Sequence, residues 1–195
     1  MIPRKILSTE KPKLLEHMTQ DMVGEDRRLR FGYPAPDASV ESYIERSWGR
    51  LGKGDQWFVV EDKGRIVATC HVSFVTDTQA EMGCTVAPEY KAQGIGQALF
   101  DRGANWARAK GATHVYMQCL SENQVIQHIA KKNGMTTITL APGEKEATVR
   151  IERSELSAVA HDNVTETIAI CDGIVRTQQW LFESIMKRSL GLTSK

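Results

Sequence analysis

Several features that would place a protein in a specialised class are missing from this sequence of 195 residues. The four cysteines (Cys70, Cys84, Cys119 and Cys171) are widely spaced, form no CxxC pair and have no histidine cluster beside them. We therefore expect neither a zinc site nor a disulfide framework, and no other metal centre. Because cysteine is among the most often buried residue types, we predict that the four are buried free thiols.

The sequence also has no excess of either charge and no long hydrophobic run. Its formal net charge is +1, which gives no global attraction to nucleic acid or to an anionic membrane. The longest apolar runs, at 57–60 and 66–75, are much shorter than the roughly 20 residues that span a bilayer. The first residues lack the apolar core of a signal peptide. We predict a cytoplasmic protein that has neither nucleic acid nor a membrane as its partner.

What the sequence does contain is enough apolar material for one sizeable core. Hydrophobic residues make up 41% of the chain and charged residues 25%, in a length that is short for two complete domains. The hydrophobic periodicity and the turn residues predict an α+β fold, in which helices pack on both sides of a mixed, mostly antiparallel sheet of about seven strands. The expected helices are 11–24, 39–51, 95–110 and 122–134, the expected strands are 4–8, 56–62, 66–75, 80–86, 113–120, 135–141 and 145–152, and 25–37 is expected to be a loop.

Two glycines one residue apart, Gly94 and Gly96, open the helix that follows the strand 80–86. The dinucleotide fingerprint GxGxxG fails because Leu99 stands at its third glycine, and the P-loop pattern is absent. What remains is a helix start at which the main-chain amides of residues 93–98 face one point. Such amides, together with the positive end of the helix dipole, form an anion site. A diphosphate group would fit it.

This segment resembles the signature [RQ]xxGx[GA] of the GNAT superfamily of N-acetyltransferases, and the resemblance covers roughly residues 4–152. The signature corresponds here to Lys91, Ala92, Gln93, Gly94, Ile95 and Gly96, with lysine in place of the usual Arg or Gln. The resemblance implies that acetyl-CoA is the co-substrate. Its pyrophosphate would be held by the amides of Gln93, Gly94, Ile95, Gly96, Gln97 and Ala98. Its pantetheine arm would lie near Thr85, Val86 and Asn123, with Asn123 also capping a helix.

Acetyl transfer requires a neutral amine, yet a lysine with a pKa near 10.4 is neutral in only about one molecule in a few thousand at pH 7. A general base is therefore expected, and Glu81 is the best candidate, because strand alternation places it on one face with Gly83 and Thr85. A glutamate here resembles the base of the bacterial protein lysine acetyltransferases, and Arg30 and Phe31 match a loop motif of the same proteins. The amide of Val86 is expected to stabilise the oxyanion, with the strand bulging there as it does in the family.

The general acid of many members of this superfamily is a tyrosine in the segment after Asn123, and Ala130 occupies that position here. Tyr116 and His128 are alternative acids, although we expect His128 to lie on a solvated helix face. A thiol of pKa near 8.5 is also a good leaving group without a positioned acid. We expect Arg27, Arg28 and Arg30 to form a solvated charge cluster, with an acidic acceptor as the alternative interpretation.

We divide the chain into an acetyltransferase domain, 1–152, and a C-terminal helical extension, 153–195. Seven residues of the extension (Val164, Ile168, Cys171, Val175, Phe182, Ile185 and Met186) form an apolar stripe over an expected helix 163–190. The stripe is expected to pack on the protein's own domain, and the alternatives are a homodimer contact or a partner. The leading functional hypothesis is an N-acetyltransferase that moves an acetyl group from acetyl-CoA to a protein lysine or a small amine. The alternative is a non-catalytic acyl-CoA-binding regulatory domain.

Overall fold

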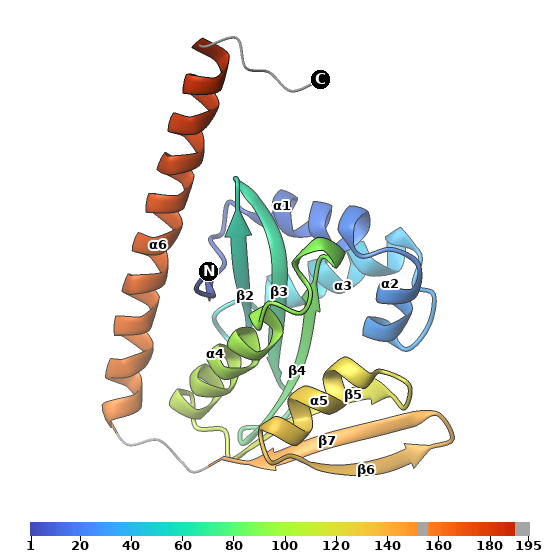
Figure 1. Ribbon diagram of the computed structural model, residues 1–195. Helices are drawn as coiled ribbons and strands as arrows, with labels where there is room; N and C mark the ends of the chain where they lie inside the picture. The colour runs from blue at the N-terminus through green and yellow to red at the C-terminus, as the bar shows by residue number, and fades with distance from the viewer. Residues whose placement is uncertain (152–155, 190–195) are drawn as a thin grey trace.

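The computed structural model describes residues 1–151 and 156–189 (Figure 1). A seven-stranded sheet is flanked by helices on both faces, as predicted. The elements, in chain order, are β1 (Arg4–Lys5), α1 (Lys11–Glu16), the π-helical turn η1 (His17–Asp21), α2 (Gly24–Phe31), α3 (Asp37–Gly49), β2 (Asp55–Asp62), β3 (Arg65–Phe74), β4 (Gln79–Val86), the 3₁₀ turn η2 (Pro88–Tyr90), α4 (Ile95–Ala109), β5 (His114–Leu120), α5 (Gln124–Lys132), β6 (Thr136–Ala141), β7 (Glu144–Arg150) and α6 (Leu156–Ser189).

The strands run in the order β1-β2-β3-β4-β5-β7-β6. All neighbouring pairs are antiparallel except β4 and β5, which are parallel because α4 crosses over between them. The two parallel strands pair over only three residues, Gln79–Glu81 with His114–Tyr116. Beyond these pairs the strands separate, and the sheet opens between the second half of β4 and the second half of β5.

Side chains alternate between two cores, one on each face of the sheet. On one face, Phe58, Met82 and Val115 pack with Leu99 and Trp106 of α4, and α5 adds to the same core. On the other face a second, smaller core lies beneath α1, η1 and α3. Residues of β4 with odd numbers, including Glu81 and Gly83, therefore face the N-terminal helices.

The N-terminal helices differ from the prediction. The helix expected over 11–24 ends as a π-helical turn at Asp21, and Gly24 begins α2 instead of ending the first helix. The loop expected over 25–37 is confirmed for 32–36 and was wrong for 25–31, because Gly24–Phe31 is helical. None of the residues of α2 is fully buried, so this helix has no apolar periodicity to reveal it, although the acidic residues in its first turn and Gly32 at its C-terminus are typical helix boundaries. The first strand is also shorter than expected, and α3 begins two residues before the expected capping residue, Ser39.

The C-terminal helix α6 is attached to the domain by charged groups near its start. Arg102 of α4 pairs with Asp162, and its Nη2 donates to Glu166 at 2.6 Å. Lys5 Nζ lies 2.8 Å from the second carboxylate oxygen of Asp162, and Ala169 is buried against the domain. The apolar stripe, by contrast, is exposed, so the expectation that it packs on its own domain was wrong. Figure 1 shows the later turns of α6 extending beyond the sheet.

Candidate functional site

A groove of about 620 Å³ lies where β4 and β5 separate. Its walls come from the second half of β4, the start of α4, one side of α5 and the inner side of α2. Most of its lining is apolar, with Met82, Met117 and Ile129 at its base. An elongated ligand that fills this gap lies between two strand edges, each of which carries main-chain hydrogen-bonding groups.

The main chain of β4 presents its unpaired groups to the groove. The amide of Ala87 bonds to the carbonyl of Val67, and that of Val75 bonds to Gln79, so the odd-numbered residues of β4 form the bonds to β3. The amides and carbonyls of Cys84 and Val86 consequently point toward the open side. The pairing of β3 with β4 runs without a register shift from Phe74 opposite Ala80 to Ala68 opposite Val86. The expected bulge at Val86 was therefore wrong, and ordinary strand alternation is sufficient to expose its amide.

The start of α4 closes one end of the groove. Ala92 and Gly94 both have left-handed backbone conformations, with φ of 59° and 77°, which turn the chain sharply before the helix begins. The first intrahelical bond runs from the amide of Ala98 to the carbonyl of Gly94, at 3.0 Å. The amides of residues 94–97 precede this bond and point out of the helix end, as an anion site requires.

Five of the expected cofactor residues in and around the signature line the groove, as do Thr85, Val86 and Asn123. The five are Lys91, Gly94, Ile95, Gly96 and Gln97, and Ala92, which was not predicted, lines the groove as well. Ala98 does not belong to the cradle, because its amide is used within the helix. The side chain of Gln93 bonds to the carbonyl of Glu89 at 3.2 Å, away from the groove lining.

Two of these residues have partners that the sequence did not indicate, and a third has the partner that was expected. Lys91 Nζ pairs with Asp26 of α2, and both residues line the groove. The hydroxyl of Thr85 is turned away from the groove toward Thr69 and the buried imidazole of His17. Asn123 caps α5 by accepting a bond from the amide of Ile126 at 3.2 Å, so the expected cap is confirmed.

Glu81 lies on the face of the sheet that carries the N-terminal helices, next to the groove rather than in its lining. Tyr116 of β5 donates from its hydroxyl to Glu81 Oε2 at 3.4 Å, and Ser73 of β3 lies opposite Glu81 in the strand register. Burial, together with the charges of Glu81 and Glu146, raises the pKa of Tyr116 to about 12. Tyr116 therefore keeps its proton at neutral pH and holds the carboxylate by a hydrogen bond.

Arg30 lines the groove close enough to Glu81 to interact with its charge, and its guanidinium is buried, contrary to the expectation that Arg30 belongs to a solvated cluster. Its guanidinium lies directly over Gly83, so close that a Cβ at that position would be 2.3 Å from Arg30 Cζ. Arg30 Nη2 donates to the hydroxyl of Tyr43 at 2.7 Å, and its Nε is buried without a hydrogen-bond partner among the described residues. Gly83 therefore leaves room for the guanidinium of Arg30, and a larger residue at this position would push the end of that side chain aside.

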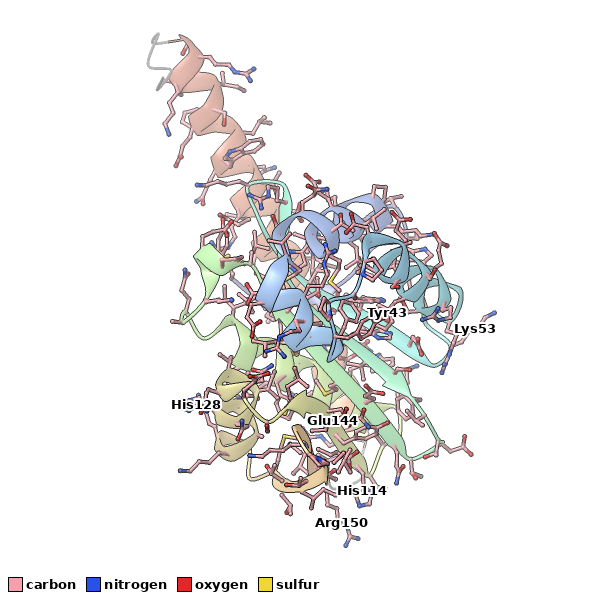
Figure 2. The ribbon with its side chains drawn as sticks, turned by 90° about the vertical axis from the view of Figure 1, so that its right-hand side faces the viewer. Tyr43, Lys53, His114, His128, Glu144 and Arg150 are labelled. Atoms are coloured by element: carbon pink, nitrogen blue, oxygen red, sulfur yellow. The ribbon has the colours of Figure 1, made fainter. Side chains whose placement is uncertain are left out.

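Behind Arg30, a chain of hydrogen bonds leads into the protein. The hydroxyl of Tyr43 lies 2.6 Å from Nδ1 of His71, whose Nε2 lies 3.2 Å from Asp55. Burial lowers the pKa of His71 and raises that of Tyr43, so both are neutral. Tyr43 then donates to Nδ1, and Nε2–H of His71 donates to Asp55. Figure 2 views the sheet from the side of the N-terminal helices, with Tyr43 over the strands and His128 on α5 at the edge.

His128 is exposed, as predicted, although it also borders the groove. Ala130, which occupies the usual position of the tyrosine acid, is buried in the core. The expectation of four buried cysteines was wrong for two of them, because Cys84 is half-buried beside the groove and Cys171 is exposed on α6. The described residues contain no cluster of three metal-ligating side chains, and no helix in them is both long and apolar enough to cross a membrane.

Comparisons with known proteins agree with this geometry. Residues 20–135 match the acetyltransferase (GNAT) family. A Bacillus subtilis (strain 168) protein provisionally named [ribosomal protein bS18]-alanine N-acetyltransferase is 27% identical over 79 residues, which are 40% of this chain and 52% of that protein. The match thus spans about half the length of that curated relative.

Two solved structures illustrate the likeness of fold. The GNAT domain of S. lividans PAT superimposes with a TM-score of 0.67 at 18% identity, over 76% of this chain and 89% of that one. YncA from Salmonella typhimurium, solved with its cofactor acetyl-CoA, gives a TM-score of 0.63 at 14% identity, over 78% of this chain and 94% of that one.

Proposed function

The chain belongs to the acetyltransferase (GNAT) family, and from this premise we propose that it transfers the acetyl group of acetyl-CoA to a primary amine. The observation that carries the proposal is the groove between the separated strands, with the helix start of α4 at one end. It offers strand-edge groups for an amide-containing arm and helix amides for a diphosphate, in one continuous cavity.

The residues present fit acetyl-CoA. The amides of residues 94–97 would hold the pyrophosphate, and the main chain of Cys84 and Val86 would pair with the pantetheine arm. Bound in this way, acetyl-CoA supplies an activated acetyl group as a thioester. The amide of Val86 faces the groove and would stabilise the negative charge that develops on the acetyl oxygen.

We propose Glu81 as the general base that takes the proton from the acceptor amine. Glu81 is ordered by Tyr116 and lies on the sheet face next to the groove, which suits a group that acts on a second substrate. Arg30 places a positive charge near the same point. This charge disfavours the ammonium form of an incoming amine and so favours the neutral form that can attack. The amine then attacks the acetyl carbon in a ternary complex, the C–S bond breaks, and the thiolate of CoA departs.

No acid is required for the departing thiolate. Ala130 cannot supply a proton, and Tyr116, with a pKa of about 12, is a poor donor to a thiolate. Thiols are far more acidic than alcohols or amines, with a pKa near 8.5 for cysteine, so the thiolate of CoA leaves readily and takes its proton from solvent.

A protein amine is the acceptor that we propose, either a lysine side chain or an N-terminal residue. The support is the Bacillus subtilis relative, whose name specifies an alanine of a ribosomal protein, and the resemblance of Glu81, Arg30 and Phe31 to the protein lysine acetyltransferases. The cofactor side contains fixed main-chain groups, whereas the acceptor side is bordered by α2 and α3, which leaves room for selectivity between amines.

The test is release of CoA thiol by the full chain, measured with a thiol reagent across a panel of amines. The panel contains lysine peptides, peptides with N-terminal alanine, polyamines and aminoglycosides. We expect acetyl-CoA to raise the melting temperature and a peptide amine to release thiol. Stabilisation by acetyl-CoA without thiol release from any amine would instead support the alternative, a non-catalytic acyl-CoA-binding regulatory domain. An unchanged melting temperature would contradict both.

A further inference from the structure

The exposed stripe of α6 follows the heptad period of a coiled coil. With Ile168, Val175 and Phe182 at position a, the residues at position d are Val164, Cys171, Gln178 and Ile185. All seven are exposed, with 58% of the surface of Val164 and 66% of that of Phe182 accessible. The spacing of 3.5 residues is the one by which a helix keeps a continuous seam against another helix.

The stripe lies on the side of α6 that faces away from the domain. The residues that contact the domain are Asp162, Glu166, Ala169 and Gly173, the last lying against Arg4. At about 100° per residue, these four fall within an arc of about 60°, and the stripe is centred about 180° from them. A second helix can therefore lie along the stripe without meeting the domain. Figures 1 and 2 both show the later turns of α6 projecting beyond the rest of the molecule.

The exposed apolar area on α6 is as large as that of a stable protein–protein interface. Ile174 and Leu181 at g positions and Met186 at an e position flank the seven a and d residues and are exposed as well. Eight of these apolar side chains, each exposing roughly 100 Å², would bury about 800 Å² per partner, the area of a standard specific interface. An apolar patch of this size is seldom left in contact with water.

We propose that α6 pairs with α6 of a second copy of this chain, as a parallel, in-register, two-stranded coiled coil. β-branched residues occupy two of the three a positions, which favours parallel dimers. Gln178 is the single polar residue of the seam, and its amide meets its own counterpart only when the two helices are parallel and in register. At the flanking e and g positions, the g–e′ pairs Thr167–Asp172, Ile174–Gln179 and Leu181–Met186 bring no like charges together. The two domains then lie on opposite sides of the seam.

The first experiment measures the mass of the full chain in solution by sedimentation at micromolar concentration. We expect a dimer, and we expect Phe182→Glu to weaken dimerisation by at least about 100-fold, because it places two carboxylates in one apolar layer. Thr177→Glu is the matched control, since it adds the same charge at an exposed position outside the seam. A monomeric wild-type chain, or an equal effect of the two substitutions, would overturn the proposal. Stabilisation of each variant by acetyl-CoA reports that its domain is folded.

The second experiment tests the direction and register of the helices. Cys171 occupies a d position and is the one exposed cysteine among the described residues, so a thiol oxidant should join two chains there. Cys171→Ser should abolish this cross-link, and adding Ile185→Cys to that variant should restore it, because in a parallel pair both d layers bring identical residues together. In an antiparallel pair, the two copies of a residue can meet at no more than one of these two positions. A cross-link at only one position, or at neither, would therefore exclude the parallel in-register pair.

Discussion

The proposed cofactor groove and the proposed acceptor face, which is the sheet face around Glu81, both lie on β4 and are built from different groups. The groove relies on main-chain groups: the amides of residues 94–97 and the even-numbered residues of β4. The acceptor face relies on side chains from four elements, with Arg30 from α2, Tyr43 from α3, Glu81 from β4 and Tyr116 from β5. A main-chain site constrains a few consecutive positions to glycine, whereas a side-chain site depends on contacts between distant positions.

This difference has a functional consequence. If acetyl-CoA binds as proposed, the main-chain groups recognise what every acyl-CoA has in common, namely its phosphates and amides, whatever the acceptor. In the proposed mechanism, side chains carry the chemistry and the choice of acceptor. Substitutions in the two regions should therefore separate cofactor binding from turnover.

The largest expected effect is that of Glu81→Gln, which removes the proposed base and keeps the shape of the side chain. We expect kcat/KM at pH 7 to fall by about 10²- to 10⁴-fold while the Kd for acetyl-CoA is unchanged. The defect should shrink as the pH rises toward the pKa of the free amine, because solvent then supplies the neutral form. Kinetics at several pH values, with calorimetric titration of acetyl-CoA, measure both quantities. Full activity of the variant at pH 7 would remove Glu81 from the mechanism.

Gly94→Ala should have the opposite pattern to Glu81→Gln, with weaker binding of acetyl-CoA and little change in turnover. The left-handed conformation of Gly94 costs a residue with a side chain about 1–2 kcal/mol, which corresponds to a roughly tenfold weaker Kd for acetyl-CoA if the helix start shifts. The value of kcat at saturating acetyl-CoA should change little. Gly111→Ala is the matched control, because Gly111 has φ of 98°, open space around it and no place in the groove lining. Equal Kd values for the two variants would show that the conformation of Gly94 does not matter for binding.

Arg30→Gln tests a residue that borders both the groove and the proposed acceptor face. Without the guanidinium, the ammonium form of the acceptor is less disfavoured, so the acid limb of the kcat/KM profile should move to higher pH by up to about one unit. A purely structural role for Arg30 would lower activity equally at all pH values. The pH profile of the variant, compared with that of Arg28→Gln on the exposed side of α2, distinguishes these outcomes.

The smallest expected effect is on stability, and its test compares one histidine from each region. Burial lowers the pKa of both His17, which bonds to Thr85 by the groove, and His71, which lies behind Tyr43. Below pH 6.5 the unfolded chain binds protons that the folded chain does not. The free energy of unfolding therefore decreases as the pH falls. His17→Gln and His71→Gln should each reduce this loss, by at most about 1.4 kcal/mol per pH unit. Urea unfolding at pH 5 and pH 7 measures the difference, and an unaltered slope in either variant would show that the histidine does not contribute.

The sequence allowed the groove to be predicted well and the acceptor face only in part. A glycine pair at a helix start is a local signal, and its position between a strand and a helix was sufficient to predict most of the residues at this end of the groove. That these residues bind an anion stays a prediction. The contact of Arg30 with Gly83 joins positions 53 residues apart, and no spacing in the sequence reveals it. The helix α2 was missed because it lacks an apolar face, and the arginines were therefore misplaced in a solvated loop. The stripe on α6 was visible in the sequence, but its outward direction depends on the ion pairs of Arg102, which only the fold brings together.

The three-residue pairing of β4 with β5 also divides the sheet into two parts, β1 to β4 and β5 to β6, that share only a short ladder. The open strand edges beside it carry free amides and carbonyls that could recruit a strand from another chain. A thioester ligand that pairs with these edges serves as a substitute strand, completes the sheet and joins its two parts. If acetyl-CoA binds as proposed, amide hydrogen exchange should therefore slow on both sides of the gap, in β4 and in β5.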